Sequence, residues 1–286
     1  MKFGVMFANV GPYVEPDMAA AFGRIAEEHG IESLWAVEHV VVPADYESQY
    51  PYSPSGRMPG PEESPIPDPL IWLTWVGAAT TTLRLATGIL ILPQRNPVIL
   101  AKELATLDVL SKGRVELGVG VGWLREEFDA LGVPFEERGA RMDEYIEALR
   151  TLWREEEPCF EGQYARFDRA KCYPKPPQGT IPIHVGGHTP AAARRAGRLG
   201  DGFFPGRSTD DDLVPLLDAM RASAKDVGRD PDAIEVTAGG VLDLDGVRRF
   251  VDYGVDRIVL PPLGFDLETL REQLGRFSEQ VIEKVG

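Results

Sequence analysis

Short apolar runs alternate with helical patterns along most of this chain, and that alternation constrains the fold more than any other feature. Amphipathic helices are predicted over Met18–His29, Pro97–Leu110 and Leu267–Val285. Asn96 is the expected N-cap of the second of these helices. Strands that alternate with helices pair in parallel through right-handed crossovers. The eight expected strands are Phe3–Ala8, Ser33–Val37, Leu83–Ile89, Val115–Val119, Ile181–Val185, Gly202–Phe204, Ile234–Ala238 and Arg257–Leu260.

Eight strand–helix units in 286 residues predict an α/β fold of the (β/α)8 TIM-barrel type. A doubly wound sheet is the alternative, and the strand count favours the barrel. Residues 1–286 are expected to form a single domain. Two proline-rich insertions interrupt the alternation, Pro43–Pro69 after strand 2 and Trp153–Pro182 before strand 5. In a barrel the first insertion would be a loop on the active face. The alternative is a variable surface loop without a role in function, which would have the same sequence pattern.

The segment Arg114–Trp123 starts as the fourth strand and ends in alternating glycines. Glycine removes the Cβ atom where a backbone must approach something closely. Gly120, Gly122 and Trp123 are therefore expected to form one wall of a ligand site, with a buried strand and a tight exit turn as the alternative. The G-x-G-x-G spacing is not that of a dinucleotide site, and the chain contains no P-loop motif.

Glu38 and His39 directly follow the second strand, where a barrel carries its functional groups. An imidazole titrates near neutrality, so His39 is a candidate acid or base for a substrate hydroxyl. Glu38 would orient or tune this histidine, or would face the outside of the barrel. A hydrogen-bonded structural histidine is the alternative for His39.

The run Gly186-Gly187-His188-Thr189 follows the fifth strand and leads into a helix with Thr189 as N-cap. Two glycines before a helix N-terminus can form an anion site from backbone N–H groups and the helix dipole. We therefore predict a phosphate seat here, with a plain capped helix as the alternative. His184 and His188 are separated by two glycines, which argues against a zinc pair, and no metal site is expected.

The net charge of −15 argues against nucleic acid and anionic membranes as partners. The chain has only two cysteines, no uncharged apolar stretch of spanning length and no signal-peptide pattern, so a reducing, cytoplasmic location is expected. The motifs of metal-dependent barrel hydrolases, zincins and serine hydrolases are absent, and no lysine lies at an expected strand end. The features that remain are a glycine-lined wall, one candidate acid/base histidine, aromatic side chains and a phosphate seat. They suit a flavin-type cofactor that performs the redox chemistry.

Together these motifs resemble the luciferase-like superfamily, and within it the deazaflavin (coenzyme F420)-dependent oxidoreductases. The resemblance covers residues 1 to about 205 and is weaker beyond. It rests on Trp35-Ala36-Val37-Glu38-His39, Thr87–Pro97, Leu104–Asp108, Ser111–Arg114, Gly118–Trp123 with Glu127-Phe128, Ile183–Gly187 and Asp201–Pro205.

The resemblance implies a barrel with insertions and a non-prolyl cis peptide in strand 3, at Gly88-Ile89, which backs the deazaflavin ring. It assigns the acid/base or substrate-stabilising role to His39, and it assigns cofactor and phosphate contacts to the glycines after strands 4 and 5. Related deazaflavin dehydrogenases carry a glutamate after strand 4, where this chain has Trp123. Their proton-transfer scheme and their substrates are therefore not carried over.

The leading functional hypothesis is hydride transfer between F420 and a small organic substrate, with His39 handling the substrate proton. The alternatives are an FMN-dependent monooxygenase that uses reduced flavin and oxygen, a non-catalytic flavin-binding protein, and a cofactor-free isomerase. A homodimer is expected. The sequence does not predict the substrate. An apolar pocket wall is suggested by six aromatic residues, with an ordinary place in the core as the alternative for each: Tyr46, Tyr50, Tyr52, Trp72, Trp75 and Trp123.

Overall fold

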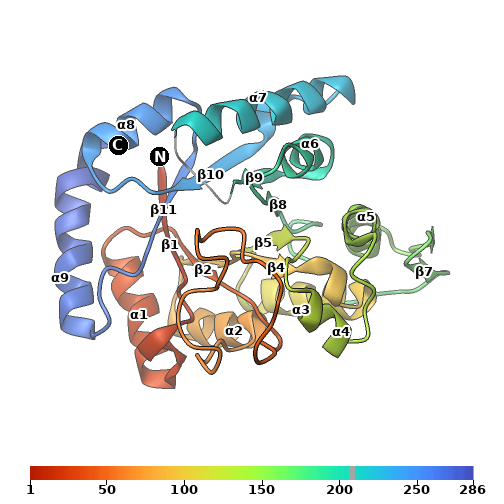
Figure 1. The fold of residues 1–286 in the computed structure, drawn as a ribbon, viewed down its shortest axis with the longest axis horizontal. Helices are drawn as coiled ribbons and strands as arrows, with labels where there is room; N and C mark the ends of the chain where they lie inside the picture. The colour runs from red at the N-terminus through yellow and green to blue at the C-terminus, as the bar shows by residue number, and fades with distance from the viewer. Residues whose placement is uncertain (206–209, 286) are drawn as a thin grey trace.

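The computed structural model describes residues 1–205 and 210–285. Its centre is a closed barrel of eight parallel strand positions, surrounded by helices (Figure 1). Every neighbouring pair in the barrel is parallel, and the ring closes because β1 pairs with β11 and β3 pairs with β5. The barrel strands are β1 Lys2–Met6, β2 Ser33–Ala36, β3 Arg84–Thr87 with β4 Leu90–Ile91, β5 Val115–Gly120, β8 Ile183–Gly186, β9 Gly202–Phe204, β10 Glu235–Gly239 and β11 Arg257–Leu260.

All eight expected strands are therefore confirmed, as is the barrel that they predicted. The third strand is divided into β3 and β4, and the peptide bond between them, Gly88–Ile89, is cis, as expected. A second cis bond, Tyr173–Pro174, lies in the insertion before β8.

The helices that follow the strands form the outer layer of the barrel (Figure 1). Asn96 caps its helix by accepting hydrogen bonds from the N–H groups of Val98 and Ile99, as its position predicted. The expected Leu267–Val285 helix is interrupted by a π-helical turn over Ser278–Ile282. The helices are α1 Pro16–Glu28, α2 Pro69–Ala79, α3 Pro97–Leu110, α4 Arg125–Ala130, α5 Arg138–Arg154, α6 Pro190–Leu199, α7 Asp210–Asp226, α8 Leu244–Asp252, α9 Leu267–Phe277 and α10 Glu283–Val285.

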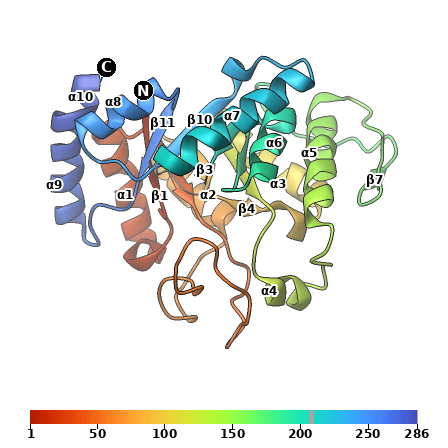
Figure 2. The same ribbon diagram turned by 45° about the horizontal axis from the view of Figure 1, so that its top comes forward.

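The two insertions occupy different parts of the molecule. Residues 43–69, here called the 43–69 loop, extend from the end of the barrel on which α4 also lies (Figure 2). The second insertion contains a small antiparallel hairpin of β6 Phe160–Glu161 and β7 Arg166–Phe167, which lies beyond α5. Among the described residues no helix combines the length and the apolar character that a membrane crossing would need.

Candidate active site

Four neighbouring strands bring the expected site residues to one arc of the barrel mouth. β2, β3, β5 and β8 follow one another around the barrel. His39 follows β2, the Gly88–Ile89 bond follows β3, Trp123 follows β5, and His188 follows β8. Because parallel strands end at the same rim, residues from four separate parts of the sequence share this mouth.

His39 is held by a buried carboxylate from α4. Its Nδ1 lies 3.1 Å from Oε2 of Glu127, and the His39 side chain is only 10% exposed. The other Glu127 oxygen, Oε1, accepts hydrogen bonds from the backbone N–H groups of Val40 (2.6 Å) and Val41 (3.3 Å). Glu127 itself is fully buried. The Glu127 carboxylate therefore orients the imidazole of His39 and also holds the backbone of the next two residues, Val40 and Val41.

Glu38 makes different contacts. Its carboxylate accepts hydrogen bonds from the N–H of Ile91 and from the Arg95 guanidinium, whose Nε lies 2.8 Å from Oε1. Arg95 also contacts Asp68 at 2.6 Å. Burial raises the pKa of Glu38, and the Arg95 charge opposes that shift. The expectation that Glu38 orients His39 is therefore corrected: Glu127 contacts the histidine, and Glu38 ties the β4 end of the third strand to Arg95.

An aromatic cluster from the 43–69 loop covers this part of the mouth. Trp123 makes edge-to-face contacts with His39, Tyr46 and Tyr50, at centroid distances of 5.7, 5.4 and 5.2 Å. Tyr50 then contacts Tyr52, whose ring lies 4.8 Å from that of His188. The loop thus carries a continuous line of rings from the end of β2 to the end of β8. The 43–69 loop therefore lies over the rim where the barrel strands end. Trp72 and Trp75 on α2 make different contacts, since their indole N–H groups donate to the backbone carbonyls of Tyr13 and Pro16.

A second carboxylate of α4 fastens the 43–69 loop. Glu126 Oε1 accepts hydrogen bonds from the backbone N–H groups of Glu47 (2.7 Å) and Ser48 (3.0 Å). Slight burial acts to raise the pKa of Glu126, but hydrogen bonds from the Ser48 side chain and from backbone amides outweigh it and hold the pKa at about 2. Burial also raises the pKa of Tyr50, and Tyr46 adds to the shift.

The strand-end glycines make room for protein atoms. A Cβ on Gly120 would lie 2.5 Å from Cδ1 of Ile89, and a Cβ on Gly186 would lie 2.7 Å from Cγ2 of the same residue. A Cβ on Gly122 would meet Ile91 and Phe128 at 2.8 Å each. The glycines were expected to admit a ligand directly. In the structure, Gly120 and Gly186 make room for the Ile89 side chain between β5 and β8, and Gly122 makes room for Ile91 and Phe128.

Ile89 belongs to an apolar platform inside the barrel, towards the rim where the strands end. We use this name for the small cluster of buried Trp35, Ala86, Phe204 and Val259, against which Met6 and Ile89 pack while remaining only partly buried. Met6 and Phe204 end their strands and Ile89 follows β3, so the platform lies at the same end of the barrel as His39. A partly exposed apolar surface at the same rim as a histidine fits a flat tricyclic ring such as that of a flavin or deazaflavin.

The predicted phosphate seat has the expected capped helix. Thr189 accepts a hydrogen bond from the N–H of Ala192 at 3.2 Å, which confirms it as the N-cap of α6. Of the first three helical residues, Pro190 has no N–H and Ala192 uses its own on the cap, so Ala191 supplies the remaining donor. Gly187 has φ +129°, and a Cβ there would lie 2.8 Å from Cβ of Ala192. A substitution at Gly187 would therefore strain the backbone as well as block a phosphate. Arg207, another candidate phosphate contact, lies outside the described residues.

A buried ionic cluster at the opposite end of the barrel interior was not expected from the sequence. Glu116, His184 and Glu235 place ligand-type atoms within 4.8 Å of one another. The fully buried guanidinium of Arg257 lies 3.0 Å from Glu116 and also pairs with Glu32 and Glu235. Arg84 also pairs with Glu116, and Lys2 pairs with Glu235. Because three cations already face the three carboxylates, the cluster is a charge-compensated part of the barrel and a poor metal site.

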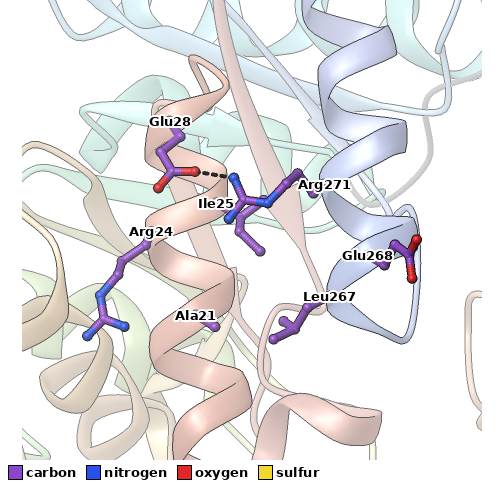
Figure 3. Close-up of a pocket in the computed structure, with 7 residues that line it drawn as sticks. All are labelled: Ala21, Arg24, Ile25, Glu28, Leu267, Glu268 and Arg271. Carbon is purple, nitrogen blue, oxygen red and sulfur yellow. Dashed lines mark hydrogen bonds and ion pairs between the residues drawn. The ribbon is translucent and has the colours of Figure 1, made fainter.

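A hollow between α1 and α9 lies on the outside of the barrel. Glu28 and Arg271 pair across it (Figure 3). We assign it no function. It is lined by Ala21, Arg24, Ile25, Glu28, Leu267, Glu268 and Arg271.

Comparison with known proteins places this geometry in context. The sequence profile described as luciferase-like monooxygenase matches residues 1–244. An uncharacterised protein of Mycobacterium tuberculosis is 35% identical over 271 residues, which cover 92% of this chain and 93% of that protein. An F420-dependent glucose-6-phosphate dehydrogenase of Kineococcus radiotolerans is 34% identical over 236 residues, which cover 80% of this chain and 65% of that protein. The solved structure of a monooxygenase from Streptomyces bottropensis matches with a TM-score of 0.77 and 25% identity, covering 100% of both chains.

Proposed function

The chain belongs to the luciferase-like monooxygenase family, and from this premise we propose that it transfers a hydride between deazaflavin coenzyme F420 and a small organic substrate. The coarser assignment, an oxidoreductase of the luciferase-like flavin and deazaflavin type, follows from the family. The observation that carries the proposed hydride transfer is the position of His39, which lies at the same rim as the apolar platform and is oriented by a buried carboxylate. The choice of F420 is supported by the 34% identity to an F420-dependent glucose-6-phosphate dehydrogenase.

The residues at the mouth fit the proposed cofactor. The platform, with Met6 and Ile89 at its partly exposed surface, would support the ring, and the N-terminus of α6 would receive the phosphate. When bound, a deazaflavin supplies the carbon that accepts or donates the hydride.

The chain's own residues would manage the proton. When an alcohol becomes a carbonyl, the carbon loses a hydride and the oxygen loses a proton, so a nearby base is needed. His39 would accept that proton in this direction and return it in the other. The ring cluster of Trp123, Tyr50 and Tyr52 would keep bulk water away from the reacting atoms.

An FMN-dependent monooxygenase is the second candidate. It is favoured by the Streptomyces bottropensis monooxygenase, whose structure matches this chain from end to end at 25% identity. The platform and α6 would serve an FMN ring and phosphate equally well, so the geometry alone does not separate the two cofactors.

Cofactor titration distinguishes the candidates. We expect oxidised F420 to bind in the micromolar range or tighter, equivalent to about −8 kcal/mol or better, and FMN to bind more weakly. Quenching of the cofactor's fluorescence during titration measures both affinities in one assay. FMN binding as tight as or tighter than that of F420 would favour the monooxygenase, and binding of neither would contradict both proposals.

We further propose that the protein forms a homodimer through α2 and α3. Both helices expose large apolar side chains: Ile71 is 74% exposed on α2, and Ile99 is 59% exposed on α3. The ion pair between Arg95 and Asp68 holds the N-terminal ends of these two helices together. Exposed apolar residues on neighbouring helices are typical of a surface that a partner covers.

A charge placed in this surface tests the dimer. We expect wild type to have the mass of a dimer in light scattering, and the double variant Ile71→Glu/Ile99→Glu to have that of a monomer, because association would bury two carboxylates. Val251→Glu is the matched control, since Val251 is 43% exposed on α8, and it should remain dimeric. A monomeric wild type, or a double variant that stays dimeric, would contradict the proposal.

A further inference from the structure

Glu127 has contacts that a helix-surface glutamate does not usually have. It lies in the first turn of α4 and is completely buried. Its oxygens face three nitrogens of the neighbouring segment, namely Nδ1 of His39 and the N–H groups of Val40 and Val41. Burial of a carboxylate is unfavourable unless hydrogen bonds compensate it, and here one segment, residues 39–41, supplies all three.

These contacts determine which nitrogen of His39 carries the proton. A carboxylate accepts hydrogen bonds and does not donate them, so Nδ1 must bear a hydrogen to bond with Glu127. A neutral imidazole carries only one N–H, which leaves Nε2 as the basic nitrogen. The 83° angle between the His39 and Trp123 ring planes, at 5.7 Å, restricts rotation of the ring from the other side.

We infer that Glu127 is a positioning residue that holds His39 in the Nδ1–H tautomer, so that Nε2 is the atom that exchanges a proton with the substrate. The inference rests on the proposed acid/base role of His39 for its consequence in catalysis. The tautomer itself does not depend on which cofactor or substrate is bound. Glu127 contacts no reacting atom in this scheme and acts only through His39.

Glu126 provides a matched control on the same turn of the same helix. Its carboxylate also accepts backbone N–H groups, but those of Glu47 and Ser48 within the 43–69 loop. Glu126→Gln therefore perturbs the fastening of the loop while leaving the contacts of His39 in place. An effect confined to Glu127→Gln separates orientation of the histidine from general loosening of the loop.

The first measurement is the tautomer of His39, read from ¹⁵N chemical shifts and two-bond ¹H–¹⁵N couplings in histidine-labelled protein. It is made at mildly alkaline pH, where an ordinary imidazole is neutral. The His39 signals are assigned by their loss in His39→Asn. We expect the Nδ1–H form in wild type and in Glu126→Gln, and conversion towards the Nε2–H form in Glu127→Gln. An Nε2–H wild type overturns the inference without any Glu127 variant, and so does an unchanged tautomer in Glu127→Gln.

The second measurement is turnover of F420 with a panel of small alcohols. Glu127→Gln should lower kcat about 10- to 100-fold with KM changed less than about threefold, as when an orienting partner behind a reacting histidine is removed. An unchanged kcat in a variant with the altered tautomer would remove Glu127 from the reaction. If wild type shows no turnover with any alcohol, the proposed function fails, and the NMR result alone then decides the structural part of the inference.

Discussion

Replacement of His39 by alanine should lower turnover about 10²- to 10⁴-fold, the range that general acid–base help contributes. The physical reason is that the oxygen of the substrate must gain or lose a proton as hydride moves. His39 is the titratable side chain that the end of β2 and the buried Glu127 hold at the mouth. Cofactor affinity should change only a few-fold, because the proposed phosphate seat lies at α6. Steady-state turnover and fluorescence titration of the same preparations measure the two effects.

Two further variants sharpen this result. His39→Asn should recover part of the loss if a hydrogen bond to the developing oxyanion is sufficient. His29→Ala is a control, because His29 caps the end of α1, outside the barrel mouth, and its loss should leave turnover unchanged. Unchanged turnover in His39→Ala would exclude His39 and direct attention to His188. Retained cofactor binding without any wild-type turnover would instead favour the non-catalytic flavin-binding protein.

The barrel was predictable because its signals are local. Each strand is a short apolar run and each helix has its own periodicity and cap, as Asn96 and Thr189 show. The right-handed connection of such units is shared by a barrel and a doubly wound sheet, so it left the strand order open, and only the count of eight strands favoured the barrel. The cis bond at Gly88–Ile89 was expected only from the resemblance to a family, and the division of the third strand at this bond was not expected.

The contacts within the site were less predictable because they join distant segments. Glu127 is 88 residues from His39, and neither residue's neighbours in sequence indicate the pairing. Glu38, next to His39, was the obvious partner, but consecutive residues at a strand end point in different directions, and Glu38 faces Arg95. Gly120 was interpreted as part of a ligand wall and Gly186 as part of a phosphate seat, because an absent Cβ indicates that something approaches closely but does not identify it. In the structure it is Ile89.

The buried ionic cluster around Arg257, at the opposite end of the barrel interior from His39, leads to a prediction about stability. Arg257 is fully buried, and its guanidinium donates to both oxygens of Glu32 at 2.9 and 3.0 Å. It also pairs with Glu116 and Glu235, and it lies 5.3 Å from the centre of the Trp35 ring, which belongs to the platform. Burial acts to raise the pKa of Glu116, but the hydrogen bond from His184 and the charges of Arg257 and Arg84 outweigh it. The pKa of Glu116 is therefore held well below its usual range.

Arg257→Met should lower the free energy of unfolding by about 3–5 kcal/mol, because it removes the fully buried cation that contacts Glu32, Glu116 and Glu235 and leaves Glu116 paired with Arg84 and Glu235 paired with Lys2, both partly exposed. Urea unfolding near neutral pH measures the loss. Arg271→Met is the control: the Arg271–Glu28 pair is solvent-exposed and its removal should cost less than about 1 kcal/mol. Equal losses in the two variants would show that Arg257 is no more important to stability than a surface arginine.

The pH dependence of this difference tests its electrostatic origin. In wild type the folded-state pKa of Glu116 lies below its ordinary value of 4.5, so its stabilising contribution is present above that pH and is lost as pH falls below it. In Arg257→Met one of the charges that depress the pKa of Glu116 is gone, so Glu116 accepts a proton at a higher pH, and protonation relieves the penalty of burying a carboxylate that has lost part of its compensating charge. The difference in unfolding free energy between wild type and variant should therefore shrink as the pH is lowered through this range. A difference that stays constant with pH would instead assign the loss to the packing of the arginine side chain against Trp35 and its neighbours.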